Sequence, residues 1–211
     1  MSIPFNRLRE LVFQANSNDL WPMLRSDHWI RQKAAGSINP AQVETVLIQL
    51  SEHWPETAQP LAEIVEQFPL GEAALLHLLA VSSICAARLT HDPDILLWLC
   101  QPQICAAPRG YAEMLGYLQR SAGNSIADQG FSALRLWKGR EMTRIAVREL
   151  ANVASLEETT GELSQVAEIC IRNVFEHWNA ELRQQYGSPK AEFAILALGK
   201  LGGGELNHSS D

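Results

Sequence analysis

The sequence lacks the patterns that mark a membrane or secreted protein. Its longest apolar segment, residues 73–87, is interrupted by His77 and two serines, so no stretch has the length of a transmembrane helix. The N-terminus lacks the charged head and apolar body of a signal peptide. The four cysteines show no C-x-x-C spacing, which is typical of reduced core residues rather than of metal ligands or disulfides. We therefore expect a cytoplasmic protein.

Basic residues are also scarce. The chain has 17 Lys and Arg against 24 Asp and Glu, which gives a formal net charge of -7. This balance argues against a broad surface for nucleic acid or for an anionic membrane, although it permits a local basic site. With 211 residues, 46% of them hydrophobic, the chain is long enough to bury a core in one or two domains.

Common catalytic signatures are absent as well. The sequence has no G-x-S-x-G elbow, no G-x-G-x-x-G motif, and no glycine-rich loop closed by Lys-Ser or Lys-Thr. Five scattered histidines lack ligand spacing, and the six tryptophans are spread out as helix-packing anchors usually are. These absences exclude the best-known nucleophile and P-loop sites.

What the sequence does contain is mostly helical pattern. Asn39 before Pro40, Asp92 before Pro93, and Ser155 three residues before Glu158 are helix-start signals. They predict helices at 40–54, from Asp92 onward, and from Ser155 to Gly187. Other helices are expected from Gly71 through Ala86, at 111–119 and at 128–154, and a loop at 121–124. The apolar face of the 155–187 helix is expected to include Trp178 and Leu182.

The chain divides into three parts on this pattern. Residues 1–124 form an N-terminal helical region, residues 125–187 a long helix pair, and residues 188–211 the start of a further domain. Residues 193–198 are a short, continuous apolar run between Pro189 and Gly199, which predicts a buried strand. No internal repeat of 20–50 residues is evident.

The last thirteen residues, GKLGGGELNHSSD, come after that strand as a glycine-rich loop. Such a loop often serves only as a turn. The preceding strand, Lys200 within the loop, and the Ser209-Ser210-Asp211 run favour a phosphate-binding loop instead. Gly202 and Gly203 are expected to offer N–H donors, and Ser209 or Ser210 a hydroxyl. Phosphate contact and simple exposure are equally weighted for Lys200, and His208 is expected on the surface of the loop.

Two motifs together resemble a known family. The GKLGGGELN stretch followed by SSD is similar to the signature of bifunctional glutamine synthetase adenylyltransferase/adenylyl-removing enzymes, a branch of the DNA polymerase β-like nucleotidyltransferases. Residues 134–146, LRLWKGREMTRIA, resemble the arginine-rich helix that precedes their catalytic fold, with Gly139 where the family usually has arginine. The resemblance is specific over about residues 130–211. The residues of the motif resemble those of the first, adenylyl-removing half of these enzymes.

The resemblance implies a fold, a reaction and partners. The fold would be mainly α, a helical bundle that leads into the first strand and glycine-rich loop of an α/β (α+β) nucleotidyltransferase fold. Asp211 would be a catalytic residue and a ligand of Mg²⁺, and Gly202, Gly203, Ser209, Ser210 and Lys200 would lie at the nucleotide, ADP or ATP. The partners would be glutamine synthetase and a PII-type signalling protein. A chain with one such carboxylate is expected to be inactive alone.

Alternatives remain open at two points. Arg140, Arg144 and Arg148 share one helical face, where they either form a surface ion-pair network with Glu141 and Glu149 or border a phosphate or partner site. The helical body itself could be a regulatory module that docks glutamine synthetase or a PII-type protein. A third possibility is a nucleotidyltransferase of the same superfamily with another substrate.

Overall fold

The computed structural model describes residues 27–122 and 128–209 of the chain, and these residues are mostly helical. A first helix covers residues 27–35. The labelled helices after it are α3 (Pro40–His53), α4 (Leu61–Glu66), α5 (Glu72–Val81), α6 (Ser83–His91), α7 (Asp94–Leu99), α8 (Pro102–Cys105), α9 (Tyr111–Ala122), α10 (Asp128–Leu150), α11 (Leu156–Tyr186) and α12 (Gly199–Gly202). The described residues contain no β-strand.

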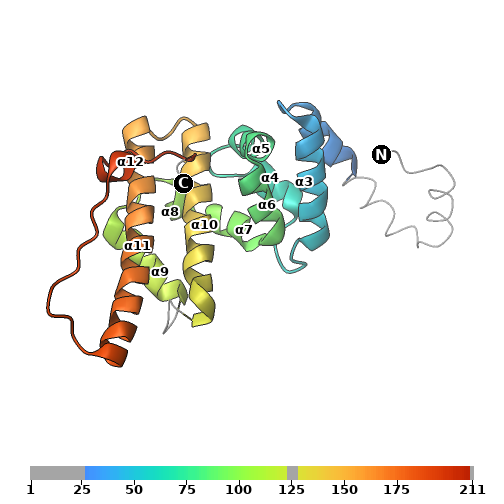
Figure 1. Cartoon of the computed structure of the whole chain (residues 1–211). Coiled ribbons are helices and arrows are strands. Elements are labelled where there is room, and N and C mark those ends of the chain that lie inside the picture. The colour runs from blue at the N-terminus through green and yellow to red at the C-terminus, as the bar shows by residue number, and fades with distance from the viewer. Residues whose placement is uncertain (1–26, 123–127, 210–211) are drawn as a thin grey trace.

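The helices form two packed groups on either side of α10 (Figure 1). The first hydrophobic cluster draws its residues from the helices between 27 and 105, with Ala146 and Val147 of α10 added. The second lies among α9, α10 and α11 and includes Met114, Trp137 and Ile169. Packing thus groups α9 with the long helix pair, whereas the proposed boundary at residue 124 is a sequence-based division that stays a prediction.

The start signals of several helices are confirmed. The Asn39 side chain accepts a hydrogen bond from the N–H of Gln42 at 3.4 Å and caps α3. Ser155 accepts from the N–H of Glu158 at 3.2 Å, and α11 ends before Gly187, whose φ of 85° suits glycine. These helices therefore begin and end within about a residue of their predicted bounds. Helix α9 is three residues longer than predicted, so Ser121 and Ala122 are helical rather than loop.

One predicted helix is two helices in the structure. The segment from Gly71 through Ala86 breaks at Ser82, and α5 and α6 meet there at an angle of 107°. Ser82 does not continue the apolar face, because its side chain accepts a hydrogen bond from the N–H of Cys85 and caps α6. Asp92 also differs from its predicted capping role: α7 begins after Pro93 without a side-chain cap, and the Asp92 carboxylate binds Arg140.

The predicted buried strand at 193–198 is wrong in this structure. The segment leaves the end of α11 and runs back beside that helix as an extended chain (Figure 1). Phe193 stacks on Phe175 of α11 with ring centroids 5.3 Å apart, but Leu196 and Leu198 are 85% and 83% exposed. A strand needs a neighbouring strand for its backbone hydrogen bonds, and the described residues supply none.

The end of α11 differs from its beginning. Leu163, Val166 and Ile169 are buried in the second cluster, as predicted for the apolar face. Trp178 and Leu182, predicted on the same face, are 54% and 52% exposed, although Phe131 of α10 contacts the neighbouring His177 with ring centroids 5.2 Å apart. The apolar stripe is continuous in sequence, but its residues become less buried toward the end of the helix.

Candidate functional site

Helices α10 and α11 form an antiparallel pair that carries the candidate site at its turn. Helix α10 ends in a Schellman motif: the N–H of Asn152 bonds to the carbonyl of Glu149 at 2.9 Å, and that of Val153 to Arg148 at 3.2 Å. Asn152 has a φ of 57°, a left-handed conformation that asparagine tolerates better than most residues. The motif fixes the last turn of α10 beside the first turn of α11.

A largely buried group of ionised side chains joins the two helices, and we call this group the Arg–Glu network. It consists of Arg109, Glu141, Arg144, Arg148, Glu158 and Glu162. Arg144 of α10 donates to Glu141 at 2.8 Å and to Glu162 of α11, and it has no exposed side-chain surface. Arg148 donates to Glu158 of α11 and to the carbonyl of Cys105, and this second bond connects α8 to α10.

Arg109 completes the network from the chain just before α9. Its guanidinium binds Glu141 and, at 2.9 Å, Glu113, while its backbone N–H donates to Glu162 at 2.8 Å. Glu141 and Glu162, the two fully enclosed carboxylates, thus have two donors each, which offsets the high cost of removing the charges from water. The network fixes α9, α10 and α11 relative to one another.

The two interpretations of the arginine face can now be compared with these contacts. Ion pairing is confirmed, but the network is buried and not on the surface of the helix. Arg140 alone is partly exposed, and it binds Asp92 at 3.2 Å. Glu141 is a partner as expected, whereas Glu149 binds a different residue. Arg144 and Arg148 are enclosed, with 0% and 2% of their surface exposed, so a role at a phosphate or partner site stays a prediction.

The surroundings change the ionisation of these groups. Burial raises the pKa of Glu141, against the opposing effect of Arg144 and Arg109. Burial also works against the charge of Arg144, but the carboxylates of Glu141 and Glu162 outweigh it and raise the pKa of that guanidinium. Arg144 therefore stays charged, and its role is to hold two buried carboxylates in place.

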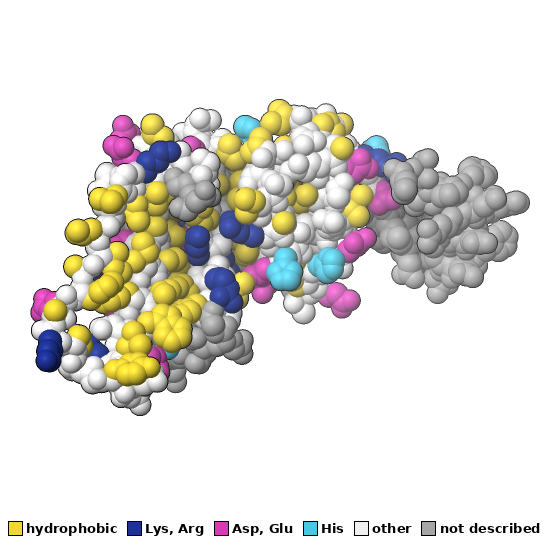
Figure 2. Space-filling view, in the orientation of Figure 1, with side chains coloured by type: hydrophobic (Ala, Val, Ile, Leu, Met, Phe, Trp, Pro, Cys, Tyr) yellow, Lys and Arg dark blue, Asp and Glu magenta, His cyan; other side chains and the backbone are white. Residues whose placement is uncertain are grey.

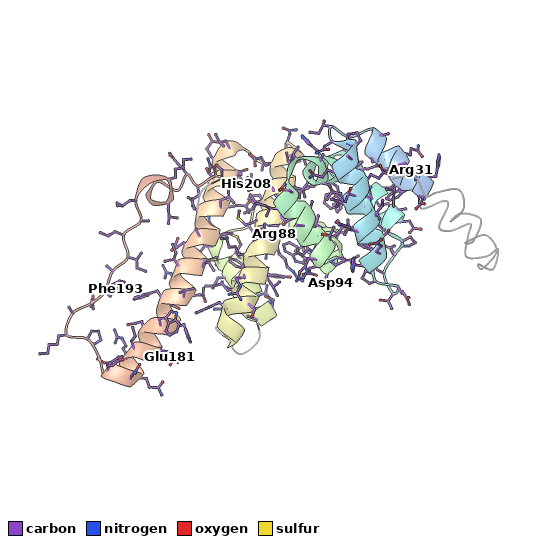
Figure 3. The ribbon with its side chains drawn as sticks, turned by 45° about the vertical axis from the view of Figure 1, so that its right-hand side comes forward. Arg31, Arg88, Asp94, Glu181, Phe193 and His208 are labelled. Atoms are coloured by element: carbon purple, nitrogen blue, oxygen red, sulfur yellow. The ribbon has the colours of Figure 1, made fainter. Side chains whose placement is uncertain are left out.

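The terminal loop, residues 199–209, lies at the turn end of the α10–α11 pair (Figure 1). His208 contacts the end of α10 through Nε2, 3.0 Å from Oε2 of Glu149, and Figure 3 shows it at this end of the pair. The N–H of Leu206 donates to the Ser164 hydroxyl of α11 at 3.2 Å, and the Leu206 side chain packs on the second hydrophobic cluster. Three contacts thus attach the loop to two helices.

The backbone conformation of the loop explains why glycine occupies two of its positions. A Cβ at Gly202 would lie 2.5 Å from the carbonyl oxygen of Ala197, so any side chain would force the backbone apart. Gly204 has a φ of 70°, which side chains disfavour. The N–H groups of Gly202 and Gly203 bond to the carbonyls of Leu198 and Gly199 at 3.2 and 3.0 Å. They would have to leave these bonds to bind a phosphate, so their binding role stays a prediction.

The other predicted site residues fall in three places. The side chain of Lys200 is exposed on α12. Ser209 is exposed and donates to the side chain of Asn207 at 3.0 Å. Ser210 and Asp211 lie outside the described residues. The structure thus brings Lys200, Gly202, Gly203 and Ser209 together in one loop.

Two general features complete the description. Within residues 27–122 and 128–209, no group of three His, Cys, Asp or Glu side chains is arranged to hold a metal ion. In the same residues no single helix is long and apolar enough to cross a membrane, and α5 with α6 reaches that length only as a bent pair. All four cysteines are free, and burial raises the pKa of Cys100 and Cys105 to about 11, so both stay protonated thiols.

Sequence reasoning missed several of the residues that build this site. Arg109 follows Pro108 in a region without helical periodicity, so nothing in the sequence indicated its role in the site. The positions of Glu158 and Glu162 were informative: they mirror Arg148 and Arg144 about the turn near Val153, as an antiparallel helix pair requires. Ser164 and Leu206 could not be paired from sequence, because 42 residues separate them.

The architecture is thus that of a helical protein whose last helix pair carries a glycine-rich loop. The family model for glutamate-ammonia ligase adenylyltransferase matches residues 72–211, which span α5 to the terminal loop. The chain belongs to this family.

Curated relatives agree with this assignment. Each of three is a "bifunctional glutamine synthetase adenylyltransferase/adenylyl-removing enzyme". The protein of Thioalkalivibrio sulfidiphilus is 33% identical over 76% of this chain, that of Hahella chejuensis 29% over 77%, and that of Shewanella loihica 31% over 82%. The matches cover only 16–18% of the length of these relatives. No solved structure matches the chain.

Proposed function

We propose that this chain is part of an enzyme that removes AMP from a tyrosine of glutamine synthetase, and that it leads into the adenylyl-removing half. The observation that carries the proposal is the family match, which extends without interruption from the helical body to Asp211. The other half of the parent protein would add AMP. Glutamine synthetase is thus the expected partner, with a PII-type protein as a second one, and the cytoplasm the expected location.

The proposed reaction is a phosphorolysis. An oxygen of inorganic phosphate attacks the α-phosphorus of adenylyl-tyrosine, the bond from that phosphorus to the tyrosine oxygen breaks, and the tyrosine oxygen takes up a proton. The products are ADP and unmodified tyrosine, so atoms and charge balance. Because the protein mainly has to position groups in such transfers, donors at the phosphate oxygens and paired carboxylates are the residue types required.

The chain supplies part of that set. Asp211 is a suitable Mg²⁺ ligand, since carboxylate oxygens suit this ion, and Mg²⁺ would stabilise the charge that develops on the phosphate oxygens. Ser209 and Ser210 directly precede that carboxylate in sequence, and Lys200 lies earlier in the same loop. Carboxylates elsewhere in the site are engaged, Glu149 by His208 and Glu162 by Arg144.

The extended segment at 193–198 has a place in the same proposal. Its side chains are apolar on both sides, as in a strand covered on both faces, and it is exposed in the described chain. We infer that it becomes a strand of the nucleotidyltransferase domain when further strands of that domain are present. Its exposure in the described chain is consistent with this arrangement.

The test uses the full-length protein with adenylylated glutamine synthetase, phosphate and Mg²⁺. We expect ADP to appear as AMP is lost from glutamine synthetase, and Asp211→Asn to slow this by about a hundredfold or more, since even indirect ligand partners contribute 10–100-fold. Retention of the AMP-adding activity by Asp211→Asn serves as the control. Unchanged deadenylylation in that variant, or release of AMP instead of ADP, would contradict the proposal.

A second candidate is that the helical body docks a regulatory partner. The observation in its favour is that this body has its own hydrophobic clusters and an internal ion-pair network, so it holds its shape without a catalytic domain. Calorimetric titration of the 211-residue chain with glutamine synthetase or a PII-type protein tests it. Binding as tight as that of the full-length protein would support a docking module, and absence of binding would remove this candidate.

A further inference from the structure

The terminal loop is held by two polar contacts and one apolar contact, each to a different residue of the helix pair. Ser164 accepts from the N–H of Leu206 at 3.2 Å, and Glu149 lies 3.0 Å from His208. The Leu206 side chain adds a hydrophobic contact with the second cluster. Contacts to two helices at once restrict both the position and the rotation of the loop, which a single contact would not do.

The two anchors are themselves held rigidly. The Ser164 hydroxyl donates to the carbonyl of Thr160 at 2.8 Å, so its lone pairs point in a fixed direction toward the loop. Glu149 lies in the last turn of α10, whose backbone is fixed by the Schellman motif. Their sequence neighbours Arg148 and Leu163 are 2% and 3% exposed. The anchors therefore belong to the most constrained part of the molecule.

The chain before the loop is held much less. Residues 188–198 are exposed along their whole length, and their main contact with α11 in the described structure is the stack of Phe193 on Phe175 (Figure 3). This segment lies on the outside of α11, so it has little surface with which to fix the loop after it. The position of the loop is set by its own contacts and not by the segment that delivers it.

We propose that Ser164 and Glu149 are positioning residues, which hold the loop on the α10–α11 pair and thereby fix the position of Ser209. The inference rests on the proposed function, because that function assigns Ser209 and its loop to the nucleotide. It assigns a role in catalysis to two residues of the helical body, outside the loop that carries the motif. His208, expected to be a simple surface residue of the loop, is the partner of Glu149 in this role.

The experiment has two measurements on Ser164→Ala and Glu149→Ala. In the 211-residue chain, amide exchange of Leu206 should become roughly fivefold faster, the effect of losing one hydrogen bond of about 1 kcal/mol. In the full-length protein, kcat for deadenylylation should fall about tenfold with KM for glutamine synthetase unchanged, since small displacements of reacting groups reduce rates by up to about a hundredfold. Ser164→Thr keeps the hydroxyl and should restore both.

Glu168→Ala is the matched control, because Glu168 forms an exposed ion pair with Arg172 on the same helix and does not contact the loop. It should change neither measurement. Fast Leu206 exchange in the unaltered chain would overturn the docking, and faster exchange with unchanged kcat would overturn the role in catalysis. If the unaltered full-length protein does not deadenylylate at all, the proposed function fails together with the catalytic role. The exchange measurement then still decides whether the loop is docked.

Discussion

The two halves of the helical body are stabilised by different interiors. Between residues 27 and 105 the core is apolar, with leucines such as Leu75, Leu78 and Leu79 completely buried. Around α10 and α11 the buried volume is shared between a hydrophobic cluster and six ionised side chains. An apolar core tolerates a range of shapes, whereas paired charges require one arrangement. The second half is thus the one whose geometry is most tightly specified, and it is the half that carries the loop.

The surfaces of the two halves differ too. Figure 2 shows hydrophobic side chains gathered over the side of the molecule formed by α10, α11 and the chain beyond them, and fewer over α3 to α6 on this face. Leu182 and Tyr186 of α11, with Leu196 and Leu198 of the extended segment, are all more than half exposed. The half with the charged interior therefore also has the more apolar exterior.

The largest effect expected from this comparison concerns Arg144. Arg144→Ala leaves Glu141 and Glu162 buried without their main partner, and we expect it to reduce the free energy of unfolding by about 3–5 kcal/mol. Leu79→Ala in the apolar half should lose about 2–5 kcal/mol through the cavity it leaves. Urea unfolding followed by circular dichroism measures both.

A second substitution in each variant distinguishes the loss of a charge partner from the loss of apolar packing. Adding Glu162→Gln to Arg144→Ala removes an unpaired charge, so part of the stability should return. Adding Leu75→Ala to Leu79→Ala should lower stability further. Equal, additive losses in both double variants would mean that the network behaves as an ordinary core. In the full-length protein, loss of activity by Arg144→Ala at unchanged stability would instead restore a ligand role for this arginine.

A smaller effect of opposite sign is expected at Gly139, in the middle of α10. A Cβ there would meet Arg88 at 3.5 Å, an ordinary contact, and the glycine has no positive φ. Gly139→Ala should therefore raise the free energy of unfolding by about 0.5–1 kcal/mol, because alanine favours the helix. Thermal unfolding measures the gain. A loss of stability would show that α10 packs more tightly against α6 than these distances indicate.

The smallest effect tests an exposed charge cluster in the apolar half. The hydrogen bond from Trp29 and the neighbouring Lys33 lower the pKa of Glu66 below its ordinary value of 4.5. Its carboxylate therefore stabilises the folded chain above about pH 4.5, and this contribution is lost as the pH falls through the lowered pKa. The difference in Tm between the chain and Glu66→Gln should be small and positive near pH 7 and should vanish once the pH is below the lowered pKa. A difference that does not change with pH would contradict it.

The comparison also shows which features could be predicted from the sequence. Helix starts at Asn39 and Ser155 depend on hydrogen bonds three residues away, so local sequence determines them. The break at Ser82 was missed because apolar periodicity continues through it, while the packing of α3 against both α5 and α6 decides the bend. The segment at 193–198 was predicted as a buried strand from its apolar run and is extended but exposed in the structure, because the burial and pairing of a strand depend on residues distant in sequence.

In the candidate site, too, some features could be predicted from the sequence and others could not. The glycine-rich loop was evident from its composition, and the structure explains Gly202 by close approach to Ala197 and Gly204 by its left-handed backbone. Burial of Arg144 and Arg148 was not evident, because charged residues at helical spacing usually face solvent. Only the mirrored positions of two glutamates in the next helix distinguish the two cases.

The short turn between α10 and α11 has a consequence for the order of folding. Arg148 and Glu158 are ten residues apart, so their contact closes a small loop at little entropic cost. Helix hairpins of this kind form quickly, because their contacts are local. The contact of Leu206 with Ser164 spans 42 residues and waits for the whole of α11 and the segment after it. We therefore expect the helix pair to form first during synthesis, as a template on which the loop settles afterwards.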